Sequence, residues 1–241
     1  MRAQTRHQLK QDRFSRATID AAEKTVHWSV EHRGKLILAG IVGLVILGLG
    51  LGAWYYLNLK DQEASLQFSR GVRTLDTPVR PPNMPPQPDS PSFASFQERA
   101  TVAHKQFQEI VDRYPHTRSA NFARYFLGLT SAYMGDNAAA ERELEAVASY
   151  HNADLASLAK FGLASVYRNT NRAPAAIALY KQIIAKPTAT VGKVVAQMEL
   201  AATYETANQP LEAKRTYEEI QKENPASQAA QLASVKLQAL K

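Results

Sequence analysis

The chain has 241 residues, no cysteine and a formal net charge of +7 at pH 7. The absence of cysteine excludes disulfides, thiol catalysis, cysteine-ligated zinc and lipid attachment through a thiol. Residues 1–35 supply +4 of the charge, with eight Lys or Arg against four Asp or Glu. No basic run with interleaved aromatic residues occurs, so the charge does not indicate nucleic-acid binding.

The N-terminal tail, residues 1–34, is basic and is expected to be cytoplasmic. Within it Ile19, Ala22, Val26 and Val30 recur at near-helical spacing. Two interpretations stay open for this pattern: a short helix lying on an anionic membrane surface, or a marginal solvated helix.

An uncharged stretch of 24 residues, Leu36–Leu59, lies between Lys35 and Lys60. As a helix it would be about 36 Å long, enough to cross a hydrocarbon core of ~30 Å. The twelve Leu, Ile or Val residues from Leu36 to Leu57 favour its insertion by about 6 kcal/mol. The stretch is longer than the apolar region of a signal peptide and lacks a small-residue cleavage pattern. The sequence therefore predicts an uncleaved transmembrane helix over residues 35–59.

The positive charge next to this stretch predicts its orientation. The tail is more basic than residues 60–80, which carry four Lys or Arg against three Asp or Glu. This bias predicts a cytoplasmic N-terminus and a C-terminal part on the other side of the membrane. Gly48 and Gly52 form a GxxxG pair that is a candidate face for membrane helix packing, although glycine is common in membrane spans.

The next segment, residues 60–77, is expected to continue the membrane helix, with Ala64, Phe68 and Val72 on one face. Seven of the twelve prolines then fall between Pro78 and Pro91. Because each proline removes a hydrogen-bond donor and fixes φ, residues 78–92 are predicted to be an extended loop.

Residues 93–241 contain a repeat. Ala103, Ala140, Ala176 and Ala213 are 37, 36 and 37 residues apart, and each is followed four residues later by Phe, Leu or Tyr. Thirteen residues before the last three alanines stand Leu127, Leu163 and Leu200, each followed by Gly or Ala. Apolar residues recur at helical spacing in between. Two helices per unit and a fixed period predict an all-α solenoid of about four helix pairs.

Small residues at fixed positions are expected to let neighbouring helices approach closely. The residues assigned to repeat packing are Ala103, Phe107, Gly128, Ala140, Leu144, Ala164, Ala176, Tyr180, Ala201, Ala213 and Tyr217. A last helix is expected to cap the stack, with Asn224 as its N-cap and Pro225 at its first helical position.

This pattern resembles the tetratricopeptide repeat, over roughly residues 100–225. The Leu-Gly/Ala pairs, Tyr167, Tyr204 and the prolines that close the units match that family, whereas Ser131 departs from it. The resemblance implies binding of proteins on a concave face built from the first helix of each unit. In the repeat register that face holds Phe122, Tyr125, Tyr133, Phe161, Arg168, Asn169, Met198 and Glu205, a largely apolar set that suits apolar or unfolded segments.

Catalytic patterns are missing from the sequence. The six histidines show no metal-ligand spacing, and no phosphate-binding loop occurs. The chain is therefore expected not to be an enzyme and to need no cofactor or metal.

One membrane span followed by a repeat domain resembles the ancillary SecYEG translocon subunits of the bacterial inner membrane. The resemblance implies a periplasmic repeat domain whose partners are translocon subunits, chaperones or unfolded clients. The proline-rich loop departs from that pattern. The alternative is a scaffold in envelope assembly or cell division, resembling the cell-division coordinator repeat proteins, and formation of a homo-oligomer stays open.

Overall fold

The computed structural model of the protein describes residues 32–85 and 91–240. Throughout these residues the fold is helical, which confirms the predicted all-α solenoid with its long apolar N-terminal helix. The chain divides into two compact units, residues 1–56 and 57–241. The predicted amphipathic pattern in the tail, Ile19 to Val30, lies outside the described residues.

Helix α2, Arg33–Asp76, contains the whole predicted span. Its apolar part is long enough to cross a membrane, and its large apolar side chains from Leu36 to Leu59 are exposed. The boundary between the two units falls inside this helix, after Tyr56. Residues 57–76 of α2 therefore belong to the repeat unit, where Ala64 and Gly71 are buried.

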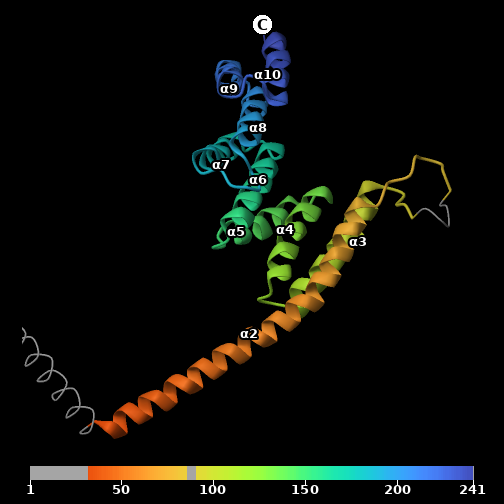
Figure 1. The fold of residues 1–241 in the computed structure, drawn as a ribbon. Helices are drawn as coiled ribbons and strands as arrows, with labels where there is room; N and C mark the ends of the chain where they lie inside the picture. Colours follow the sequence, from red (N-terminus) through yellow and green to blue (C-terminus); the bar gives the residue numbers. More distant parts are fainter. Residues whose placement is uncertain (1–31, 86–90, 241) are drawn as a thin grey trace, which may run out of the picture. The chain divides into compact units, whose positions relative to one another are not determined.

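The remaining helices follow one another as antiparallel neighbours and stack in chain order (Figure 1). Their bounds are α3, Phe96–Arg113; α4, Arg118–Tyr133; α5, Asn137–Ala148; α6, Ala153–Asn169; α7, Ala173–Ala185; α8, Lys193–Thr206; α9, Pro210–Glu223; and α10, Gln228–Ala239. Helix α4 also contacts α6, and α8 contacts α10. In these two places a first helix packs on the next one along the stack as well as on its second helix, which is how a solenoid extends its core from unit to unit.

The turn inside each unit is the same structure used three times. Gly135, Asn171 and Asn208 all have a positive φ, between 56° and 84°. Glycine and asparagine tolerate this left-handed conformation better than other residues do. The residue after each one donates its N–H back across the turn, to the carbonyl of Ser131, Tyr167 or Tyr204. The same hydrogen bond therefore closes the turn between the first and second helix in all three units.

The turn between units explains why the predicted cap of the last helix is wrong. Asn224 ends α9, and α10 begins at Gln228 with Ser227 as its N-cap, whose hydroxyl accepts from the N–H of Ala230. The earlier turn at Thr117 has the same form, since both hydroxyls also donate to the carbonyl three residues before, at Tyr114 or Asn224. Proline therefore stands inside the turn and not at the first helical position.

The first helix pair consists of the end of α2 and α3. Ala64 is fully buried, and the ring of Phe68 packs 5.8 Å from the ring of Phe107 of α3. The Asp61 carboxylate accepts from the N–H of Ser119 at the start of α4, at 2.8 Å. These contacts make the segment directly after the apolar stretch part of the repeat core.

The described ends of the proline-rich loop lie side by side. Val79 and Phe93 form an isolated bridge, with the N–H of Arg80 donating to Phe93 and the N–H of Phe93 to Pro78. Helix α3 starts at Phe96, because the Ser95 hydroxyl accepts from the N–H of Glu98 as the N-cap and the Glu98 carboxylate accepts in turn from the N–H of Ala94. The loop is thus an insertion whose two ends are fixed between α2 and α3.

Candidate partner-binding surface

An aromatic cluster joins α2, α3 and α4. Phe126 stacks on Phe107 at 5.0 Å and meets the edge of Phe68 at 5.5 Å. Phe122 lies 6.2 Å from Phe68 and is 38% exposed. The cluster therefore runs from a fully buried ring, Phe107, to a ring that solvent and a partner can reach.

Helix α4 presents the exposed aromatic residues of the predicted groove. Tyr133 is 68% exposed at the end of the helix. Tyr125 is half-buried against the core between α5 and α6, and this burial raises the pKa of its phenol. Asn169, at the end of α6, is exposed. These positions leave Phe122 and Tyr133 as the aromatic side chains of the set that a partner could cover most extensively.

The other predicted groove residues are engaged within the fold. Phe161 packs edge-on against the buried Tyr180 at 5.6 Å, and Met198 packs against the same core cluster. Arg168 pairs with Glu199. The eight residues therefore do not form one continuous apolar face.

Glu205, the last residue of the predicted groove, holds the C-terminal helix in place. Its carboxylate accepts from the phenol of Tyr217 at 2.5 Å and pairs with Lys236 of α10 at 3.3 Å. Burial and this hydrogen bond raise the pKa of Tyr217.

The residues assigned to repeat packing are all buried. They are Ala103, Phe107, Gly128, Ala140, Leu144, Ala164, Ala176, Tyr180, Ala201, Ala213 and Tyr217. At Gly128 a Cβ atom would lie 2.6 Å from Cγ of Leu144, so only glycine permits the present distance between α4 and α5. Gly48 and Gly52, the predicted packing pair in the span, are exposed and have open space beside them.

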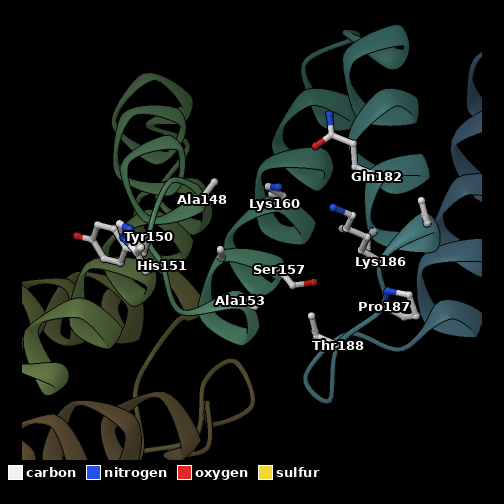
Figure 2. A pocket seen from close by; sticks show the side chains of 13 residues that line it. Ala148, Tyr150, His151, Ala153, Ser157, Lys160, Gln182, Lys186, Pro187 and Thr188 are labelled. Atoms are coloured by element: carbon white, nitrogen blue, oxygen red, sulfur yellow. The ribbon is translucent and has the colours of Figure 1, made fainter. Parts of the chain in front are cut away.

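Two contiguous cavities, which the sequence analysis did not predict, open along the turn between α5 and α6. The larger holds about 620 Å³ and lies between the start of α6 and the end of α7; the smaller holds about 540 Å³ and reaches the start of α4. Tyr150 and His151 line both. Figure 2 shows Ser157 and Lys160 facing Gln182 and Lys186 across the larger cavity. Phe122 lines the smaller one, so it adjoins the exposed aromatic side of α4.

Basic side chains line these cavities. The larger is bordered by Lys160 and Lys186, the smaller by Arg118, and no Asp or Glu of the described residues lines either. A third cavity of about 320 Å³ between α7, α8 and α9 differs, because Lys181 and Arg215 share it with Glu212 and Glu219. Within the described ranges no cluster of three His, Asp or Glu residues has the arrangement of a metal site.

Comparison with known proteins agrees with this architecture. The fold is that of a tetratricopeptide-type solenoid, which is typical of scaffolds for protein–protein interaction. The sequence profile of the family described as "Tetratricopeptide repeat-like domain" matches residues 26–187, and the chain belongs to this family. The match includes the apolar stretch as well as the first units.

A solved structure shares the fold. A crystal structure of nearly identical TPR-like repeats, from a Podospora anserina protein assigned as a kinesin light chain, superposes with a TM-score of 0.55. The two are 16% identical, and the match covers 75% of this chain and 85% of the other. No curated protein matches the sequence.

Proposed function

We propose that this protein is a scaffold tethered to the bacterial inner membrane, with its N-terminus in the cytoplasm and its repeats in the periplasm. The observation that carries the proposal is the order of features along α2. Leu59 ends the apolar stretch, and Ala64, five residues later, is fully buried in the first unit. A chain of this form would hold its protein-binding repeats at the membrane surface.

The proposed partners are translocon subunits, chaperones of the secretion route, or unfolded clients. A membrane-held repeat domain suits this role because its partners also work at or near the membrane. The exposed rings of Phe122 and Tyr133 on α4 are the proposed contacts for apolar segments, since large aromatic side chains contribute strongly to binding interfaces. Envelope assembly or cell division is the alternative setting for the same scaffold.

Membrane topology is tested first. Because the natural chain lacks cysteine, a single cysteine at Gln4 or at the exposed Ala178 gives an unambiguous label. The test uses cells of a bacterium with two membranes, in which the outer membrane is permeabilised and the inner membrane is left closed. In these cells a membrane-impermeant maleimide should modify the Ala178→Cys variant. The Gln4→Cys variant should react only after the inner membrane is broken. Labelling of both variants alike, or recovery of the protein without the membrane fraction, would contradict the proposal.

Partner identity is tested by photo-crosslinking in the same cells. A photoreactive phenylalanine analogue replaces Phe122 or Tyr133, and Ala178 on α7 is the control because it is exposed and carries no large side chain. Adducts specific to α4 that contain translocon subunits, periplasmic chaperones or secreted chains would support the proposal. Adducts with division or cell-wall proteins would assign the alternative, and equal labelling at Ala178 would refute the α4 surface.

A further inference from the structure

The two cavities at the turn between α5 and α6 have the charge of an anion-binding site. Lys160 lies on α6, Lys186 directly after α7 and Arg118 at the start of α4. Throughout residues 32–85 and 91–240 none of the three has a carboxylate within 4.0 Å, and no carboxylate there lines either cavity. By contrast, Lys193, Arg168 and Arg172 of nearby helices and turns each pair with a glutamate. The cations at the cavities are thus free to meet an external anion.

An unpartnered hydroxyl lies in the wall of the larger cavity. Ser157 is 94% buried, and its Oγ has no hydrogen-bond partner in the described part of the chain. A helical serine often bonds the carbonyl four residues before it, but Ser157 does not. Figure 2 shows its hydroxyl directed from α6 toward the segment with Pro187 and Thr188. Because a buried hydroxyl without a partner is unfavourable, a ligand oxygen seated here would supply what the fold leaves unsatisfied.

The remaining lining is partly apolar in the larger cavity and mostly polar in the smaller one, where Asn121, Ser149 and Asn152 lie. Alanines of α5, α6 and α7, together with Ile183 and Pro187, form the walls between the cations. Tyr150 and His151 line both cavities, which therefore lie next to each other; together the two cavities are called the path, and they extend from α7 to α4. A free phosphate needs one compact cluster of donors, whereas spaced cations with apolar and polar side chains between them fit a chain segment that carries several groups.

We propose that this path binds an acidic, extended segment of a partner protein, with Lys160 and Lys186 holding a carboxylate over Ser157 and Arg118 holding a second one. The ammonium groups donate charge-assisted hydrogen bonds to the carboxylate oxygens, and the Ser157 hydroxyl donates a further one after rotation about its side-chain bond. This inference rests on the proposed function as a protein-binding scaffold and names the chemistry of one class of partner. The path adjoins the exposed aromatic side of α4 at Phe122, which lines the smaller cavity, whereas Tyr133 lies outside both cavities.

The test uses the full-length protein in micelles of an uncharged detergent. The probe is a capped peptide, acetyl-Ala-Leu-Glu-Glu-Leu-Ala-amide with a neutral dye, followed by fluorescence anisotropy; its glutamine counterpart is the peptide control. We expect the glutamine peptide to bind at least about tenfold more weakly, because two charge-assisted contacts are lost. The substitutions Lys160→Gln and Lys186→Gln should each weaken binding of the glutamate peptide by about tenfold. Lys181→Gln, at the cavity of mixed charge, should change its affinity less than about twofold.

Ser157→Ala separates binding from folding. Removing an unpartnered buried hydroxyl should leave the unfolding midpoint unchanged or raise it, yet weaken peptide binding by about two- to tenfold. The inference is overturned if the glutamate and glutamine peptides bind equally, if neither binds, or if Lys181→Gln costs as much as Lys160→Gln. Displacement of the peptide by inorganic phosphate, at concentrations where acetate has no effect, would overturn the peptide assignment and reassign the path to phosphate. Since the protein is purified and the peptide defined, failure here leaves the membrane and crosslinking tests of the proposed function unaffected.

Discussion

Replacing Gly128 with alanine tests whether α4 and α5 approach as closely as the repeat requires. The added Cβ would lie 2.6 Å from Cγ and 2.9 Å from Cδ2 of Leu144, well inside the ~3.5–4.0 Å at which carbon atoms attract. Leu144 is fully buried and has no solvent side to move into. Overpacking of this kind costs about 1–3 kcal/mol, and a distance of only 2.6 Å between the two carbon atoms places the cost in the upper part of that range.

Helix propensity acts in the opposite direction. Alanine in place of glycine inside a helix is worth about 1 kcal/mol, so the net loss of unfolding free energy for Gly128→Ala should be about 1–2 kcal/mol. Gly162→Ala is the matched control, because it also lies inside a helix but its Cβ would come only to 3.3 Å, from the tip of Leu129. This control should keep its stability or gain up to about 1 kcal/mol.

Urea unfolding of the full-length protein in detergent micelles, followed by far-ultraviolet circular dichroism, measures the difference between the two variants. A thermal scan should show Gly128→Ala melting about 2–8 °C below the natural protein, for a repeat unit of this size. In a background of Leu144→Ala, the space opened beside α4 should remove the cost of Gly128→Ala. If Gly128→Ala is as stable as Gly162→Ala, or if its cost persists without Leu144, the close-approach argument is refuted.

Three further outcomes are expected. Ser227→Ala should cost about 1 kcal/mol and speed amide exchange at the start of α10, whereas Asn224→Ala, the wrongly predicted cap, should not expose those amides. Burial raises the pKa of Tyr180 to about 12, so the stability it contributes is complete below about pH 10 and is lost as the pH rises toward 12; Tyr180→Phe should flatten that alkaline loss in urea titrations at about pH 8 and 11. Phe68→Ala should destabilise the repeat by about 1–3 kcal/mol in the same urea assay, less than a fully buried ring, whereas Leu66→Ala, 68% exposed on the same helix, should have little effect.

The positions that repeat every 36 or 37 residues could be predicted from the sequence because packing fixes them. Ala140, Ala176 and Ala213 must be small and buried wherever a second helix meets its neighbours, and the sequence period exposes that requirement. The residue at which the last helix, α10, begins could not be predicted from this period. Asn224-Pro225 has the form of a cap followed by a first-turn proline, and only the matching turn at Tyr114–Thr117 indicates that the hydroxyl two residues after proline is the cap.

Surface positions were harder to predict than core positions. The repeat register places Phe161 and Met198 on first helices, but it does not say which neighbours cover them. In the structure both pack against the core cluster around Tyr180. The basic path could not be predicted because it combines Lys160 and Ser157 of α6 with residues in or beside the turns between units, whose lengths vary and leave no period. A usable signal was present: Arg118, His151 and Lys186 all fall in or beside these turns.

The contacts of α2 restrict how a soluble form of the repeats could arise. Release by proteolysis would require a cut between Leu59, the last apolar residue, and Asp61, whose carboxylate caps the N–H of Ser119. A cut further along would remove Ala64 and Phe68 and leave the rings of Phe107 and Phe126 uncovered. A stable released domain therefore needs cleavage within this short interval, whereas a tethered domain needs none.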